Sequence, residues 1–452
     1  MIEKLLAQNE GQTLEFKEST KSLLPIIKAV VAFANTAGGV IVIGVEDKSK
    51  KIIGIEEVLD EEERLVNAIS DSIEPFLVPD IEIQNFRNKE LIIINIPHTA
   101  GPFYIKSEGP EKGVYIRSGS TNRRADLNML ENLKLYSRKI SFDEKACLEM
   151  QTVNLDWDLI EKVFSWINKE PNTDQAYNLG LLVDHFGRQY PSNGAVILFA
   201  KNRLSLFPDA HIKCVRFKGK NKSEMQNYLD INGYLINGIE EAINFIENHT
   251  RTGVEIGRIK RVEFFQYPLQ AIREAVINAV VHTDYAIQGS SIMISIFDDR
   301  LEIANPGGIP LGITLERALA GASRVRNRVI ARVFRELKII EQWGSGLQRI
   351  IDSCLKYGLK KPLFEDFYSE FVVTLYAEKE KETNLYADKK ILVDYLNENE
   401  RISTQEAAKL WKIVPRTART KLKHLVEEGL IKRIGLSLKD PYGVYVLTSK
   451  IW

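Results

Sequence analysis

The sequence predicts an α/β protein of several domains that ends in a small, mainly helical unit. Its 452 residues correspond to about three domains of ordinary size. Short β-rich apolar runs alternate with segments whose apolar residues follow helical spacing, which favours α/β architecture. The charged run Glu378–Glu382 predicts a linker before the last unit. We therefore expect four segments: an α/β domain at 1–130, an α/β connector at 131–260, a second α/β domain at 261–378 and a terminal unit at 386–452.

The first segment contains one predicted helix and several predicted apolar strands, and the connector adds one further strand. The apolar spacing of Ile26–Ala34 predicts a helix, and Gly38-Gly39 ends it. The connector shows helical stretches but no chemistry that we can identify. Strands are predicted at Val40–Val45, Leu91–Ile96 and Gly113–Arg117 in the first segment, and at Ala195–Ala200 in the connector.

The third segment begins with a helix from Pro268 to about His282. The alternating run Ser291–Ile296 predicts a strand, and Asp298-Asp299 turns the chain into the returning strand Leu301–Ile303. A helix followed by a β-hairpin is therefore expected here.

The terminal unit reads as two helices followed by strands. Ser403–Leu410 predicts a short helix after a serine cap, and Pro415 stands in the first turn of a second helix that Gly429 ends. Leu430-Ile431 and Tyr442–Val446 predict two strands of a wing. This pattern resembles a winged helix-turn-helix.

The same unit is strongly basic. Nine Lys and Arg stand against three Glu between Arg401 and Arg433, a local charge of about +6. Such charges neutralise DNA phosphates while the second helix enters the major groove. The alternative is a winged helix that contacts only proteins. The candidate DNA-binding residues are Arg416, Thr417, Arg419, Thr420, Lys421 and Lys423.

The overall composition excludes some classes of protein. Lys+Arg and Asp+Glu are both 61, so the chain is no uniformly basic nucleic-acid coat. Cys147, Cys214 and Cys354 have no zinc or disulfide spacing, and we expect a reducing, cytoplasmic location. We find no signal-peptide pattern and no apolar run long enough to span a membrane.

An acid, an amide and two glycine turns suggest a nucleotide site. Glu274 and Asn278 are four residues apart and share a helix face. The glycine turns lie at Asn305–Pro310 and Gly344–Gly346. The amide can hold Mg²⁺ and the acid can orient water, while glycines let backbone N–H groups approach phosphates. The alternative is that these residues only cap helices and form turns.

These motifs resemble the GHKL nucleotide-binding fold of gyrase and histidine kinases. Glu274 and Asn278 match its N-box, which implies ATP, a catalytic Glu274 and Mg²⁺ held by Asn278. The first glycine box of that family carries an Asp that reads adenine, whereas here Ala304 and Asn305 stand nearest to it. The specificity for adenine and the hydrolysis of ATP stay open, and any ATPase activity is expected to be weak. The resemblance implies that nucleotide is bound by Asn278, Asn305, Gly307, Gly308, Arg324, Arg326, Asn327, Gly344 and Gly346, with Ser323–Arg328 in the position of the ATP lid.

His282 and Asp284 do not form a catalytic pair, because residues two apart on a helix do not face one another. We interpret them as helix-terminal structure or as residues behind the nucleotide.

The first domain carries a different resemblance. Its motifs are Phe-Ala-Asn-Thr-Ala-Gly-Gly at 33–39, Ile-Gly-Val-Glu-Asp at 43–47 and Tyr115–Thr121. They resemble the AlbA-type domain of the Schlafen family. The whole chain resembles bacterial Schlafen-type transcriptional regulators that are often labelled RecG-helicase-related. A helicase motor is not expected, because the chain has no Gly-x-x-x-x-Gly-Lys-[Ser/Thr] loop.

The Schlafen resemblance also implies an acidic site in the first domain. Glu10, Glu15 and Asp47 match an acidic triad that cleaves RNA in some relatives, where carboxylates hold Mg²⁺ or Mn²⁺. The alternative is that they are plain surface carboxylates. The candidate phosphate contacts of this domain are Lys17, Arg117, Arg123 and Arg124, with Arg117 the strongest.

Three functions therefore compete. The leading one is a DNA-binding transcriptional regulator whose GHKL-like domain binds or senses ATP. The alternatives are a metal-dependent, RNase-like nuclease used in phage defence, with RNA as partner, and a non-catalytic interaction scaffold. A homodimer is expected for the regulator, because winged-helix regulators often read two half-sites.

Overall fold

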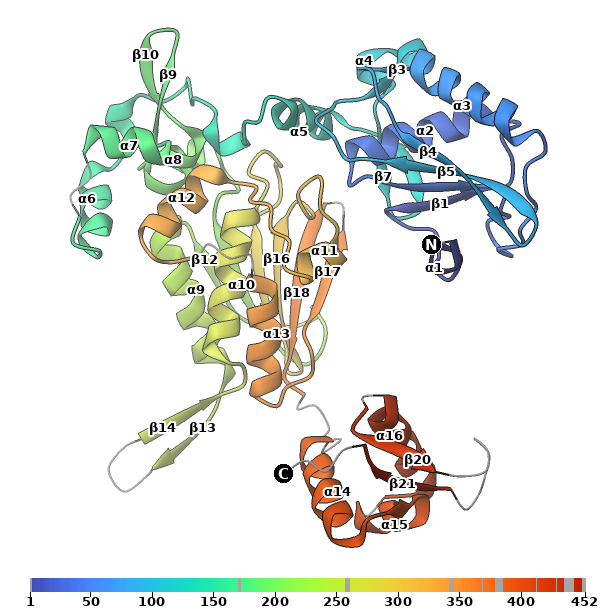
Figure 1. The fold of residues 1–452 in the computed structure, drawn as a ribbon. Helices are drawn as coiled ribbons and strands as arrows, with labels where there is room; N and C mark the ends of the chain where they lie inside the picture. Colours follow the sequence, from blue (N-terminus) through green and yellow to red (C-terminus); the bar gives the residue numbers. More distant parts are fainter. Residues whose placement is uncertain are drawn as a thin grey trace. The chain divides into compact units, whose positions relative to one another are not determined.

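The computed structural model describes residues 2–169, 172–256, 261–340, 345–367, 369–378, 385–411, 413–427, 429–434 and 443–448. The chain divides into two units, Met1–Ala377 and Glu378–Trp452. Both are mixed α/β structures (Figure 1), and the predicted fold class is confirmed.

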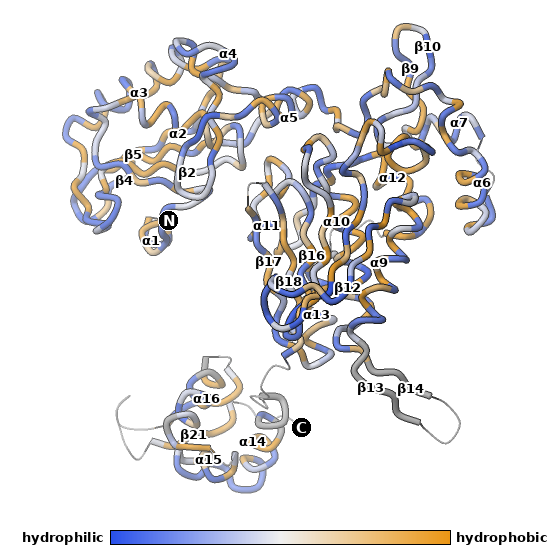
Figure 2. Tube along the Cα trace, turned by 180° about the vertical axis from the view of Figure 1, so that it is seen from behind, coloured by the Kyte–Doolittle hydropathy of each residue, from blue (hydrophilic) through white to orange (hydrophobic). Residues whose placement is uncertain are grey.

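The first domain is a four-stranded sheet covered by helices. Strands β1 and β2 are parallel, and the other neighbours are antiparallel. Figure 2 shows hydrophobic residues along α2 and the central strands. In spatial order the strands are β1 (Leu14–Lys17), β2 (Gly39–Ile43), β5 (Lys89–Ile96) and β4 (Asp80–Phe86), with α2 (Leu23–Asn35) and α3 (Val58–Ser72) packed against them.

The motif at 33–39 has a structural reason in this domain. The buried Asn35 amide donates to Phe103 O and Tyr115 O, and Asn35 Oδ1 accepts from Phe103 N. Gly38 has φ +75°, and a Cβ there would lie 2.8 Å from Ile96 O. The motif thus joins the end of α2 to β7 (Tyr115–Ser118) and lets the chain enter β2.

The connector corrects one prediction. Ala195–Ala200 is not a strand, because Asn193–Phe199 forms helix α8, all of whose residues are buried. Periodicity cannot separate a short, fully buried strand from a buried helix. The missed signal is Ser192, whose side chain accepts from Ala195 N as a helix cap.

The second domain is built on a six-stranded sheet. Helices α9 (Leu235–Thr250), α10 (Leu269–His282) and α13 (Gly346–Lys356) lie beside one another along it (Figure 1). Because β11 (Ile212–Phe217), β12 (Met225–Ile231) and α9 come from the expected connector, a boundary at 260 falls inside this sandwich. The spatial order is β12 (Met225–Ile231), β11 (Ile212–Phe217), β15 (Ile292–Ile296), β16 (Arg300–Pro306), β18 (Glu370–Tyr376) and β17 (Leu363–Phe367).

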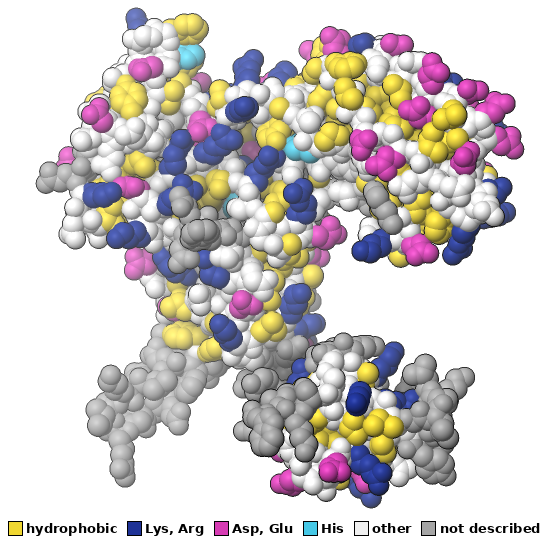
Figure 3. Space-filling view, in the orientation of Figure 1, with side chains coloured by type: hydrophobic (Ala, Val, Ile, Leu, Met, Phe, Trp, Pro, Cys, Tyr) yellow, Lys and Arg dark blue, Asp and Glu magenta, His cyan; other side chains and the backbone are white. Residues whose placement is uncertain are grey.

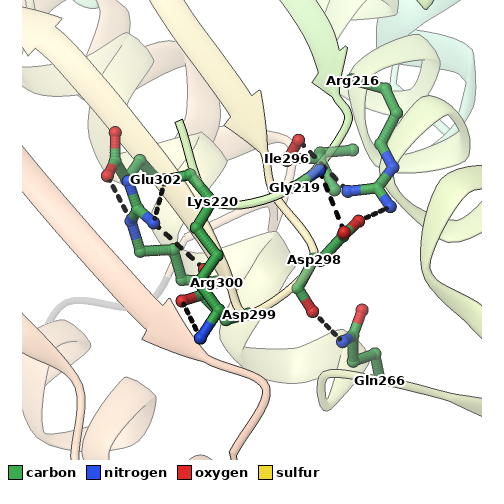
Figure 4. A network of polar contacts seen from close by, with 9 residues as sticks. All are labelled: Arg216, Gly219, Lys220, Gln266, Ile296, Asp298, Asp299, Arg300 and Glu302. Atoms are coloured by element: carbon green, nitrogen blue, oxygen red, sulfur yellow. Dashed lines mark hydrogen bonds and ion pairs between the residues drawn. The ribbon is translucent and has the colours of Figure 1, made fainter. Parts of the chain in front are cut away.

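Charged side chains hold the turn that joins β15 to β16. Asp298 pairs with Arg216 of β11, and its Oδ2 accepts from Gly219 N at 2.9 Å (Figure 4). Arg300 pairs with Asp299 and Glu302. This network fixes one end of β16, and the glycines of the candidate site follow its other end.

The C-terminal unit has the predicted winged-helix architecture. Ser403 forms a capping box with Glu406. Ala418, Leu422 and Leu425 are buried on one face of the second helix, as their spacing predicts. Tyr442 lies outside the described residues. The elements are α14 (Leu385–Asn399), β19 (Ile402–Ser403), α15 (Thr404–Leu410), α16 (Pro415–Glu427), β20 (Ile431–Ile434) and β21 (Val444–Leu447), with β21 central in the sheet.

Candidate nucleotide site

A cavity of about 160 Å³ lies between α10, the beginning of α13 and strands β16 and β18. Its floor on the sheet is mainly apolar, and its helix side is polar and charged. The predicted residues that line it are Glu274, Asn278, Asn305, Gly308, Arg324 and Gly346. The apolar floor is formed by Ile303, Ile313, Phe371 and Val373.

Glu274 and Asn278 lie together at this cavity. Asn278 Nδ2 donates to Glu274 Oε1 at 3.2 Å. Arg349 of α13 donates to Glu274 Oε2 from Nε at 3.2 Å and from Nη2 at 3.0 Å. Both oxygens of the glutamate are therefore hydrogen-bonded within the protein.

Gly346 is required by the close approach of α13 to α10. A Cβ at this position would clash with Glu274 Oε1 and would lie 3.0 Å from Asn278 Nδ2. The first turn of α13 therefore faces the acid and the amide directly. Its unpaired N–H groups and the helix dipole favour negative charge at this place. Gly344 lies outside the described residues.

The first glycine turn lies beside the cavity. Asn305 is buried, and its Nδ2 donates to Pro306 O at 3.2 Å. Gly307 has φ +82°, and a Cβ there would lie 2.6 Å from Arg326 Nη1. Gly308 reaches the cavity, whereas Gly307 does not line it. The turn thus needs glycine at position 307 for its backbone shape and for the close approach of Arg326.

The arginines of the predicted lid differ in position. Arg324 lines the cavity, and its Cζ lies 4.7 Å from the centre of the Tyr136 ring. Arg326 does not line it and pairs with Asp284 at 2.8 Å. Asn327 is buried, and its Nδ2 donates to two carbonyls at the end of α10, those of Val281 and Thr283. The structure therefore gives Arg326 and Asn327 internal partners, and their contact with nucleotide stays a prediction.

His282 and Asp284 do not form a pair in the structure. His282 lines the cavity, where burial and the charge of Arg326 lower its pKa to about 4. Its imidazole is therefore neutral at neutral pH. Asp284 binds Arg326, and it accepts from Asn132 Nδ2 at 3.0 Å. Both residues therefore belong to the structure at the C-terminal end of α10.

Two arginines of the cavity escaped the sequence analysis. Arg349 stands one turn after Gly346, and Arg335 lines the same cavity from α12 (Arg328–Glu336). Figure 3 shows Lys and Arg side chains gathered on this face of the domain. The available signals were the spacing of Arg349 from the second glycine turn and the strongly amphipathic pattern of α12.

The acids of the first domain have other partners. Arg117 donates to Glu15 and to Asn122, and its side chain is 0% exposed. Arg117 is therefore not the accessible cation that the sequence predicted, although Arg123 and Arg124 are exposed. Lys17 also pairs with Glu15.

Glu10, Glu15 and Asp47 do not form a metal cluster. Glu10 Oε1 accepts from Phe16 N at 2.6 Å, and burial raises the pKa of Glu10. Asp47 is half-exposed near Lys50. Among the described residues, no three His, Cys, Asp or Glu side chains gather closely enough to hold a metal ion.

The second helix of the winged unit exposes polar and cationic side chains. Thr417, Arg419, Thr420 and Lys423 are exposed, and Lys421 lies with Nζ 5.7 Å from the centre of the Trp411 ring. None of these residues belongs to the buried face formed by Ala418, Leu422 and Leu425. The side chain of Arg416 lies outside the described residues.

The fold and the cavity define a protein with an AlbA-type domain, an ATPase-like α/β sandwich and a winged helix. More particularly, residues 10–126 match the family "Schlafen, AlbA_2", residues 289–375 match "Putative ATP-dependent DNA helicase recG C-terminal", and residues 389–435 match "DeoR-like helix-turn-helix domain". The predicted family resemblance is confirmed. Glu274 and Asn278 precede the second of these matches.

Individual proteins also resemble the chain. The "Uncharacterized ATP-binding protein UU034" of Ureaplasma parvum is 24% identical over 213 residues, which are 44% of this chain and 58% of that protein. The crystal structure of the DIP2311 protein from Corynebacterium diphtheriae covers 99% of this chain and 96% of its own, with 19% identity and a TM-score of 0.45. The N-terminal domain of a RecG-related protein from Nitrosomonas europaea covers 28% of this chain and 91% of its own, with 23% identity and a TM-score of 0.23.

No described helix combines the length and the apolar character that a membrane crossing requires.

Proposed function

We propose that this protein is a cytoplasmic, DNA-binding transcriptional regulator whose second domain senses ATP. The observation that carries the proposal is the exposed cationic face of α16 on a chain that also holds the Glu274–Asn278 cavity. The DeoR-like match supports DNA binding, and the name of the Ureaplasma relative supports ATP. A nuclease is not proposed, because Glu15 is bonded to Arg117 and Lys17.

ATP would lie across the floor and the helix side of the cavity. Its base fits the apolar surface of β16 and β18, near Asn305. The volume of about 160 Å³ is below the usual range of small-molecule pockets, so the phosphates would lie towards the mouth. There Arg335 and the first turn of α13 would bind them through charge and backbone N–H groups. Asn278 would supply one oxygen ligand to a Mg²⁺ held mainly by the phosphates.

A gel-shift assay on genomic fragments tests the DNA-binding part. We expect sequence-selective binding by the intact chain, with an affinity that ATP changes. The double variant R419A/K423A should bind more weakly, with a salt slope reduced by about 2 because two phosphate contacts are lost. The matched control R188A/K201A removes one exposed Arg and one exposed Lys from the other unit and should bind like the wild type.

Thermal-shift titration tests the nucleotide part. ATP should raise the melting temperature of the intact chain, because a ligand that binds only the folded state stabilises it. GTP and buffer serve as comparisons. If no nucleotide shifts the melting temperature and R419A/K423A binds DNA as tightly as the wild type, the proposed function fails. The expected homodimer, which would read two half-sites, can be checked by sedimentation.

A further inference from the structure

Hydrogen-bond donors of the protein itself occupy most of the acceptor sites of the Glu274 carboxylate. A carboxylate offers about four lone-pair sites. Glu274 accepts three N–H groups: two from Arg349 at 3.0 and 3.2 Å, and one from Asn278 at 3.2 Å. The pair is only partly shielded, with Glu274 17% and Arg349 25% exposed. It therefore lies at the cavity rather than in the core.

Arg349 is itself held in position. Its Nη1 donates to Ser345 Oγ at 2.9 Å, and its backbone N donates to Ser345 O at 2.8 Å. A cation in the first turn of a helix is disfavoured by the helix dipole. Glu274 offsets this cost because its carboxylate lies between the guanidinium and the helix beginning at Gly346.

These contacts bear on what Glu274 would do in hydrolysis. In that reaction a water oxygen attacks the γ-phosphorus and the bond to the β–γ bridging oxygen breaks. ADP and phosphate leave, and a general base takes the proton of the water. The base needs a lone pair within hydrogen-bond reach of that proton. At Glu274 three of the four or so lone-pair sites are directed at Arg349 and Asn278 instead.

We infer that Arg349 is a positioning residue that withholds Glu274 from proton transfer, so that the cavity retains ATP as a signal instead of hydrolysing it rapidly. The inference rests on the proposed function, since it requires ATP to occupy this cavity.

The experiment compares ATP hydrolysis and ATP binding in the intact chain with Mg²⁺. The wild type should bind a fluorescent ATP analogue and hydrolyse ATP no faster than E274Q. Variant R349M should still bind and should hydrolyse at least about tenfold faster, because a freed general base contributes that much or more. The double variant E274Q/R349M should lose the gain. R273M removes the neighbouring exposed arginine of α10 and serves as the control for charge, with hydrolysis at the wild-type rate.

Two results would overturn the inference and leave ATP binding intact. One is an R349M variant that binds ATP but hydrolyses it at the wild-type rate. The other is a wild type whose hydrolysis falls about tenfold or more in E274Q, since Glu274 would then already act as the base. If R349M fails to fold, the hydrolysis rates of the wild type and E274Q still test the inference. Failure of every folded variant to bind ATP would instead overturn the proposed function itself.

Discussion

Two glutamates for which the sequence predicts chemistry are each bonded to an arginine, but the two pairs lie in different surroundings. Glu15 and Arg117 have side chains that are 5% and 0% exposed. Glu274 and Arg349 are 17% and 25% exposed, and both line the candidate nucleotide cavity. The same pairing is therefore buried in the first domain and borders the candidate nucleotide cavity in the second. We therefore expect the burial of the pair, more than the identity of the acid, to decide which carboxylate can meet a ligand.

The largest expected effect comes from breaking the enclosed pair. R117M should destabilise the first domain by about 3–5 kcal/mol, because Glu15 keeps a buried charge without its main partner. The loss also leaves Gly11 O and Asn122 without their donor. Hydrogen exchange of the β1 and β2 amides in the intact chain measures the free energy of opening.

The control for this variant is R123M, which removes an exposed arginine a few residues away. We expect it to change the opening free energy by no more than about 0.5 kcal/mol. An R117M effect as small as that of R123M would mean that the first pair is not structural.

The next largest effect is a pH-dependent loss of stability caused by His282, which lines the cavity. The pKa of His282 is about 4 in the folded chain, against 6.5 for a free histidine. Below about pH 6.5 His282 binds a proton in the unfolded chain, whereas in the folded chain it does so only below about pH 4. Protonation therefore favours the unfolded chain in this window, and the free energy of unfolding decreases as the pH falls. From pH 7.5 to 5.0, the wild type should lose about 2 kcal/mol more than H282Q.

Urea unfolding of both proteins at the two pH values measures this difference. Because the difference between variants is used, other groups such as Asp143, whose burial raises its pKa to about 6, cancel. Equal losses for wild type and H282Q would show that the pKa of His282 is not lowered in the folded chain.

A smaller effect is expected at the contact between α10 and α13. G346A places a methyl group against Glu274 Oε1, so the acid and Arg349 must shift. We expect the dissociation constant for ATP to rise about tenfold, which is about 1.4 kcal/mol, measured with a fluorescent ATP analogue. G233A is the matched control, because its Cβ would meet only the distant Glu241 carboxylate at 3.9 Å. Unchanged ATP binding by G346A would show that the nucleotide does not bind at the Glu274–Arg349 pair.

The sequence could predict the parts of the molecule that depend on local pattern. The spacing of Ala418, Leu422 and Leu425 identified α16, and the four-residue spacing of Glu274 and Asn278 placed both at one cavity. It could not predict the partners of the glutamates, because Arg117 lies 102 residues from Glu15 and Arg349 lies 75 residues from Glu274. Such pairs follow from the packing of separate elements. The strand expected at Ala195–Ala200 failed for a related reason, since complete burial removes the periodicity on which a local prediction depends.

The smallest expected effect is at the acids of the first domain, and it tests the comparison from the opposite side. If enclosure of Glu15 by Arg117 prevents metal-dependent chemistry, then Asp47, whose side chain is 52% exposed, belongs to no three-acid metal cluster among the described residues, although its charge acts on Glu10. After incubation with tRNA and Mn²⁺, D47N should therefore leave as much intact tRNA as the wild type does. The control D60N on α3 should do the same. The readout is the amount of intact tRNA after incubation with the full chain.

A wild type that cleaves tRNA, together with a D47N variant that does not, would show that the first domain holds a metal despite the Arg117 pair. The distinction between an enclosed pair and a pair at a cavity would then no longer predict which glutamate is chemically active.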